Sequence, residues 1–186
     1  SADAVKLCVR HGVRVIYHAN FLDEEALDLL EENKDWVFVS PNIGFTAIAA
    51  HEGEQWFSEE EVQQFGFREE LEGAARGLKE LKRRGVRILG GGDYGFGLTP
   101  HGNNARDLDH LVRYCDFTPM EALLSMTRDG GAAMDMPDHL GQIREGFLAD
   151  LLLVDGNPLD DLLVLLDREK LLVVMKDGKV HKSTGG

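Results

Sequence analysis

Four residues of this sequence have side chains that could do chemistry together. His18 ends a β-branched run, Asn42 follows a second apolar run, and Asp93 follows a third run and three glycines. His101 comes shortly after Asp93. Imidazole and carboxylate groups are typical ligands of catalytic zinc, and a carboxylate beside an ion can also act as a general base. These residue types therefore predict a site for a divalent ion or a reacting water.

The same residues also have structural interpretations. A histidine after a strand is as often a structural residue, and Asp93 could be a cap or turn residue. His51 lies in a Glu-rich segment and is interpreted as part of a solvated loop, with substrate contact as the alternative. Asp150 is interpreted as a polar residue at a strand edge. The glycines at 90–92 favour close backbone approach before Asp93.

Strands and helices alternate in the elements that must position these residues. Apolar strands are predicted at residues 13–17, 36–39 and 86–89, and helices at residues 23–33, 68–84 and 105–114 and from residue 118. Residues 44–66 are interpreted as a polar, irregular loop. Strands that are apolar throughout are typical of parallel sheets with crossover helices, and ligands meet such sheets at the carboxyl ends of the strands. We therefore expect the candidate residues to share one edge.

After Gly130 the pattern changes to strands without long helices. Residues 149–155, 171–175 and 179–181 are predicted strands, and the Asp177–Gly178 dipeptide is a strong hairpin signal. We predict two parts, an α/β body at residues 1–135 and a small β module at residues 136–186.

Several segments resemble the amidohydrolase superfamily, within the group of imidazolonepropionase-like and prolidase-like metal-dependent hydrolases. Residues 12–18 (GVRVIYH) resemble the sixth barrel strand of that family, and residues 85–93 (GVRILGGGD) resemble the eighth. Most specific are residues 140–158 (LGQIREGFLADLLLVDGNP) and the hairpin at residues 174–180. The resemblance implies an α/β fold: the C-terminal part of a (β/α)₈ TIM barrel, comprising strands six to eight and their helices, followed by a small β module.

The resemblance also implies a mechanism, in which a divalent metal, with zinc expected, activates a water to attack an amide, cyclic amide or dipeptide-like carbon. Asp93 would be a metal ligand and the catalytic base, and His18 would ligate the metal or orient the substrate carbonyl. We expect Asn42 and His101 to contact a small-molecule substrate. The H-x-H pair of the family and its ligands from strands four and five do not occur in the seventeen residues before His18. The chain is thus expected to carry only the C-terminal part of the site.

Composition restricts the classes of partner. The 186 residues include 20 Lys or Arg and 33 Asp or Glu, which gives a net charge of −13. Nucleic acids and anionic lipid surfaces both require basic partners, so neither is expected. No stretch approaches about 18 uninterrupted apolar residues, and no signal peptide is visible. Cys8 and Cys115 have no CxxC spacing, and we expect a reducing, cytoplasmic location.

Two alternatives to the enzyme stay open. The chain could be a non-catalytic fragment whose exposed strand edges self-associate, and for this reason we expect a homo-oligomer or an N-terminal partner chain. A flavodoxin-like receiver with Asp93 as phosphoacceptor is the weaker alternative. It needs an acidic cluster after the first strand, where His18, Ala19 and Asn20 stand.

Overall fold

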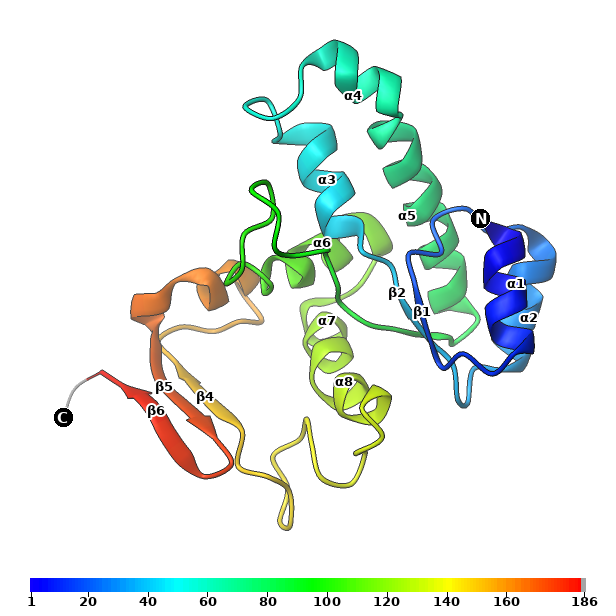
Figure 1. The fold of residues 1–186 in the computed structure, drawn as a ribbon. Helices are drawn as coiled ribbons and strands as arrows, with labels where there is room; N and C mark the ends of the chain where they lie inside the picture. Colours follow the sequence, from blue (N-terminus) through cyan, green and yellow to red (C-terminus); the bar gives the residue numbers. More distant parts are fainter. Residues whose placement is uncertain (185–186) are drawn as a thin grey trace.

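Three short strands form a parallel sheet in the computed structural model, which describes residues 1–184 (Figure 1). The strands are β1 (Val15–Tyr17), β2 (Phe38–Ser40) and β3 (Arg87–Ile88), in the order β1-β2-β3. Ile16 pairs with Val39, and Val39 pairs with Ile88. The central strand β2 is buried along its whole length, as expected for a strand covered on both faces. The predicted parallel sheet is confirmed.

Helices pack around this sheet. They are α1 (Ala2–Arg10), α2 (Glu24–Glu32), α3 (Ile43–His51), α4 (Glu59–Phe65), α5 (Phe67–Arg83), α6 (Arg106–Cys115), α7 (Pro119–Met126) and α8 (Arg128–Ala133). Helix α5 buries Leu71, Leu78 and Leu81 and contacts α2, α3, α6 and β3. Helix α7 begins with a capping box formed by Thr118 and Glu121, as its sequence predicts.

The interpretation of residues 44–66 as an irregular loop is wrong, because α3 and α4 occupy most of that segment. Helix α3 buries residues on every side, among them Gly44, Ala47 and Ala50, since it lies against both α5 and α6. A helix that is buried all round shows no apolar stripe with a period of 3.6 residues, so the usual sequence signal is absent. Helix α4 begins at the capping box of Ser58 and Glu61.

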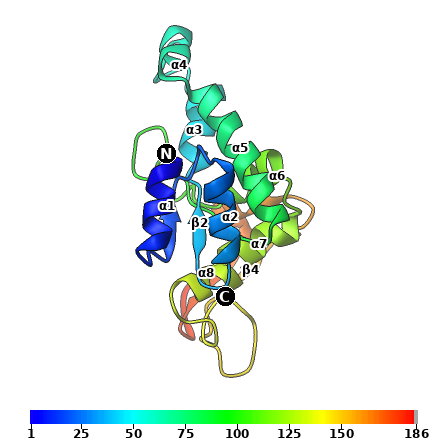
Figure 2. The ribbon, with the colours of Figure 1, turned by 90° about the vertical axis from the view of Figure 1, so that its right-hand side faces the viewer.

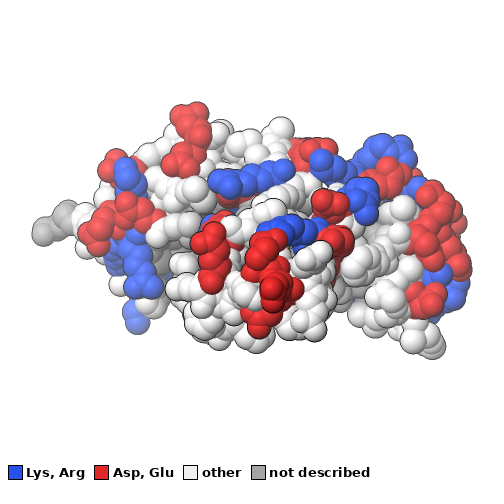
Figure 3. Space-filling model, turned by 90° about the horizontal axis from the view of Figure 1, so that it is seen from above, with Lys and Arg blue, Asp and Glu red and all other residues white. Residues whose placement is uncertain are grey.

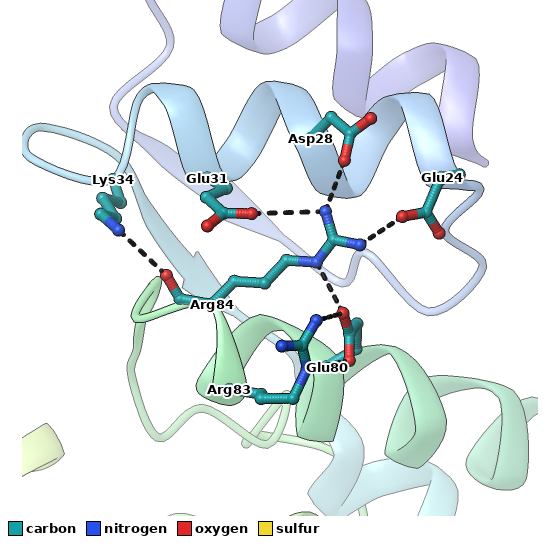
Figure 4. Close-up of polar contacts among 7 residues, drawn as sticks. All are labelled: Glu24, Asp28, Glu31, Lys34, Glu80, Arg83 and Arg84. Carbon is teal, nitrogen blue, oxygen red and sulfur yellow. Dashed lines mark hydrogen bonds and ion pairs between the residues drawn. The ribbon is translucent and has the colours of Figure 1, made fainter.

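Arg84 connects α2 to the end of α5 (Figure 4). Its guanidinium donates to Asp28 at 2.5 Å and to Glu80 at 2.7 Å, and it also pairs with Glu24. The Arg84 side chain is only 8% exposed, so these carboxylates replace most of the water around its charge. Hydrogen bonds from Arg83 and Arg84 hold the pKa of Glu80 at about 2, below its ordinary 4.5. The cluster fixes α2 against α5.

The C-terminal strands form a separate antiparallel sheet. They are β4 (Leu151–Val154), β5 (Leu171–Lys176) and β6 (Lys179–Ser183), in the order β4-β5-β6. Asp177 and Gly178 join β5 to β6 with φ angles of 49° and 72°, as a tight hairpin turn requires. The 3₁₀ helix η1 (Leu162–Leu166) packs against α6, and the 3₁₀ helix η2 (Arg168–Lys170) follows it. Figure 1 shows this sheet on the opposite side of the molecule from α1 and α2. The β module is confirmed, and its division from the body at residue 136 stays a prediction.

Helix α1 lies outside the elements predicted from the sequence. It buries Val5 and Val9 and packs against α2 near the N-terminus (Figure 2). The ammonium group of Lys6 lies 3.0 Å from the carboxylates of Asp23 and Glu25, at the start of α2. Apolar packing and an ion-pair cluster therefore fix helix α1 to α2.

The described surface carries charges of both signs. Figure 3 shows basic side chains lying beside acidic ones on the face seen from above. Within residues 1–184, none of the helices has both the length and the apolar character that crossing a membrane requires.

Candidate active site

Three candidate residues stand at the carboxyl ends of the parallel strands, as predicted. His18 follows β1 directly, Asn42 lies two residues beyond β2, and Asp93 lies five residues beyond β3. Their φ angles are 70°, 54° and 52°, in the left-handed region. Only a few per cent of non-glycine residues adopt such angles, and strained backbone is concentrated at functional sites. Three left-handed residues at one sheet edge therefore mark this edge as the candidate site.

The side chains of these residues converge. His18 Nε2 lies 3.7 Å from Asp93 Oδ2. Asn42 Nδ2 donates to Asp93 Oδ1 at 3.1 Å and lies 3.5 Å from His18 Nε2. Asn42 is buried, whereas the side chains of His18 and Asp93 are 57% and 41% exposed. The buried amide thus holds two exposed groups that remain accessible to a ligand.

His18 and Asp93 fit two ligands of one divalent ion. An ion about 2.1 Å from each, with tetrahedral angles, separates the nitrogen and oxygen by about 3.4 Å, and here the two atoms lie 3.7 Å apart. Catalytic zinc has three protein ligands. Within residues 1–184, no cluster of three or more His, Cys, Asp or Glu side chains could hold an ion. The pair therefore fits part of a metal site.

Glycines bring the turn before Asp93 against β2, as predicted from the sequence. A Cβ atom on Gly91 would lie 2.3 Å from Ser40 Oγ, closer than real Cβ atoms approach, and 3.0 Å from Asn42 Oδ1, a tight contact. Ser40 Oγ in turn donates to Asn42 Oδ1 at 3.4 Å. The absence of a side chain at Gly91 therefore allows Asn42 and Asp93 to meet.

A buried polar cluster lies behind the same turn. Asp107 and His110 of α6 are 3% and 2% exposed, and Tyr94 Oη donates to Asp107 Oδ1 at 2.9 Å. A Cβ atom on Gly92 would lie 2.5 Å from Asp107 Oδ1, so α6 packs directly on the turn. Burial and the Asp107 carboxylate raise the pKa of Tyr94, and its phenol therefore stays protonated and continues to donate. This cluster supports the turn that ends at Asp93.

A cavity of about 250 Å³ opens beside the strand ends, and three phenylalanine rings line it. Phe45 contacts Phe67 and Phe96 edge to face, with ring centroids 6.2 Å and 5.5 Å apart. The sequence reasoning missed these rings. One signal was available, because Phe45 and Phe96 each stand three residues after a candidate site residue, Asn42 and Asp93.

His101 takes a different position. It is exposed on the loop after β3, where its Nε2 would lie 3.2 Å from a Cβ atom on Gly95. Among the described residues it is not part of the lining of the cavity beside the strand ends. The structure thus brings His18, Asn42 and Asp93 together without His101, whose contact with substrate stays a prediction.

Asp150, interpreted above as a polar residue at a strand edge, lies in the β module. Its carboxylate accepts a hydrogen bond from the backbone N–H of Asp177 at 2.7 Å and pairs with Lys176. These contacts fix the β5–β6 turn, in keeping with the structural interpretation of Asp150.

The chain is similar to known proteins in sequence and in fold. Residues 1–181 match the Amidohydrolase family. This chain belongs to the amidohydrolase family. The resemblance seen in residues 12–18, 85–93 and 140–158 is therefore confirmed for nearly the whole chain.

Members of this family that are similar to the chain are much longer. An ochratoxinase of Aspergillus niger is 27% identical over 182 residues, which are 97% of this chain and 36% of that protein. A crystal structure of a Xaa-Pro dipeptidase with bound methionine is 29% identical, with a TM-score of 0.81 over 98% of this chain and 43% of the other. The crystal structure of A. niger ochratoxinase is 23% identical, with a TM-score of 0.81 over 97% of this chain and 40% of the other. The mixed α/β fold is confirmed, and the chain spans less than half the length of these relatives.

Proposed function

We propose that this chain carries the C-terminal part of the active site of a metal-dependent hydrolase that cleaves an amide or related C–N bond. The observation that carries the proposal is the convergence of His18 and Asp93 at the ends of parallel strands, 3.7 Å apart, in a chain of the amidohydrolase family. In this proposal β1, β2 and β3 are strands six to eight of a (β/α)₈ barrel. The TM-scores of 0.81 to longer amidohydrolase relatives support this assignment.

The three residues have distinct roles in this proposal. The Asp93 carboxylate accepts the proton of the attacking water and passes it to the departing nitrogen as the C–N bond breaks. His18 and Asp93 would hold a divalent ion, with zinc expected, and Asn42 keeps the Asp93 carboxylate oriented through its 3.1 Å hydrogen bond. When bound, such an ion would supply Lewis acidity toward the water and the carbonyl. The products are a carboxylate and an amine.

Hydrolysis of dipeptides and N-acyl amino acids by the chain assembled with the partner that supplies the further ligands, with zinc added, tests this function. We expect Asp93→Asn to lower the rate by about 100-fold or more, since a positioned general base contributes at least that much. Removal of the metal with a chelator should have the same effect. The matched control is His181→Asn, in β6 of the separate β module, which should hydrolyse at the wild-type rate. Wild-type hydrolysis by Asp93→Asn would contradict the proposal.

A second candidate function is assembly through the open edge of the sheet. Strand β1 is an edge strand, and a cavity of about 500 Å³ lies along it. Val13, Tyr17 and Phe21 line this cavity and are 41%, 64% and 55% exposed. Unpaired edges and exposed apolar groups favour association, so we propose that a second copy or an N-terminal partner chain covers this surface. Such a partner is also the source of the missing ligands in the first proposal.

A further inference from the structure

Aromatic side chains form much of the wall of the cavity beside His18 and Asp93. Phe45 comes from α3, Phe67 from the start of α5 and Phe96 from the loop after β3. The ring of Phe45 lies at 75° to Phe67 and at 66° to Phe96, so Phe45 contacts both other rings edge to face. Three separate elements therefore contribute aromatic surface to one cavity.

The size of this cavity matches one side chain. Its volume is about 250 Å³, whereas a cavity of about 150 Å³ lined by apolar side chains is sufficient for benzene. An aromatic ring together with its methylene group therefore fits, while a complete drug-sized ligand needs roughly 300 Å³ or more. The cavity has room for one substituent of a substrate.

A carboxylate adds a charge preference to these apolar walls. Glu70 of α5 lines the same cavity, and its Oε1 accepts a hydrogen bond from the side-chain amide of Asn20 at 2.5 Å. Asn20 is buried, so Glu70 is held at the wall by a fixed partner. A second carboxylate brought into this space would be repelled and would also lose its water. The cavity therefore favours neutral apolar groups over acidic ones.

We propose that this cavity is the subsite for an apolar, preferably aromatic, substituent of the amide substrate, with Phe45, Phe67 and Phe96 as its specificity-determining walls. Glu70 excludes acidic substituents from it. The inference rests on the proposed function, because it places the substituent beside the groups that would handle the scissile bond, His18 and Asp93. It narrows the substrate class to amides that carry a neutral aromatic or bulky apolar side chain next to the reacting carbon or nitrogen.

Binding of small amide probes to residues 1–186, measured by NMR titration without metal, tests the subsite. The probes are N-acetyl-L-phenylalaninamide, N-acetylglycinamide and the α-amide of N-acetyl-L-glutamic acid. We expect the aromatic probe to bind at least threefold more tightly than the glycine probe, because only it fills the aromatic cavity. Equal binding of these two probes would overturn the proposal.

Two phenylalanines provide a matched pair of variants. Phe96 and Phe65 are 59% and 56% exposed and both contact other rings, but only Phe96 lines the cavity. Phe96→Ala should weaken binding of the aromatic probe about three- to tenfold, the range expected for one aromatic contact. Phe65→Ala should leave binding of the aromatic probe unchanged. Equal effects of the two variants would overturn the proposal, and Phe45→Leu provides a second wall variant if Phe96→Ala is unfolded by circular dichroism.

Glu70→Gln tests the charge preference without changing the shape of the wall. The new amide oxygen can still accept from Asn20, so the fold should be retained. We expect the glutamate probe to bind at least threefold more tightly to this variant than to wild type, with the aromatic probe unaffected. If the glutamate probe binds Glu70→Gln no more tightly than wild type, the role of Glu70 is overturned. These measurements need no zinc, so a failed subsite and a failed metal site give different results.

Discussion

Asn42 holds the other two site groups in place. Its amide is buried, donates to Asp93 at 3.1 Å, lies 3.5 Å from His18 and accepts from Ser40. Its φ of 54° is one that asparagine tolerates better than most residues, which explains the residue type at the end of β2. Groups that orient metal ligands in this way contribute to affinity without touching the ion.

Asn42→Gly tests the role of the Asn42 side chain apart from that of its backbone conformation. Glycine adopts the same positive φ without cost, so the fold should persist while both contacts are lost. We expect zinc affinity to fall about ten- to hundredfold, the usual effect of removing an orienting partner. Asp116→Gly is the matched control, because Asp116 has a φ of 58° at the end of α6, outside the site. Wild-type zinc affinity in Asn42→Gly would refute the orienting role.

At the scale of elements, the position of α2 against α5 depends on ionised carboxylates around Arg84. The pKa of Glu80 in the folded protein is about 2, below its ordinary 4.5. A depressed pKa adds stability that is complete above the unfolded value and is lost as the pH falls through the folded value. The contribution of Glu80 is therefore present at neutral pH and disappears between about pH 4.5 and pH 2.

Urea unfolding of Glu80→Gln at several pH values measures this contribution. At pH 6 the variant should unfold at a lower urea concentration than wild type, and the difference should shrink steadily below pH 4.5. Glu72→Gln in the same helix is the control, since Glu72 is 74% exposed and its partner Arg76 lies 3.9 Å away. It should match wild type at each pH. A difference for Glu80→Gln that does not depend on pH would show that packing, rather than charge, is lost.

Much of this arrangement could be predicted from the sequence. Parallel strands are apolar on both faces, and polar residues at their ends mark the site edge, so His18, Asn42 and Asp93 were found together. Helix α3 was missed because burial on all sides removes its periodic stripe. The aromatic cavity was missed for another reason, since Phe67 joins Phe45 only through tertiary packing of α5 on α3.

At the scale of the whole molecule, β1 is an edge strand of the parallel sheet, with one side not paired to another described strand. Tyr17 ends this strand with its side chain 64% exposed, and the chain spans less than half the length of its relatives. In the proposed barrel a preceding strand covers this edge. The hydrolase proposal and the assembly proposal therefore both predict that the edge of β1 is covered. In the first a preceding barrel strand covers it, and in the second a second copy or a partner chain does.

Tyr17→Lys tests whether this edge mediates association of the chain with itself. A charged residue on an edge strand opposes pairing with another strand. We expect wild-type chain to elute as a dimer or larger species in size-exclusion chromatography with light scattering, and Tyr17→Lys to shift toward monomer. Val180→Lys on the edge strand β6 is the control and should elute as wild type does. A wild type that is strictly monomeric would count against self-association.

The most direct test of the central claim is calorimetric titration of residues 1–186 with zinc at neutral pH. The account predicts saturable binding of one ion, weakened at least tenfold by His18→Asn and by Asp93→Asn. Asparagine tolerates the left-handed backbone at both positions, so these variants remove the ligands with little strain. His101→Asn, on the loop after β3, should bind as wild type does. Absence of saturable binding, or equal affinity in all four proteins, would contradict the assignment of His18 and Asp93 to a metal site.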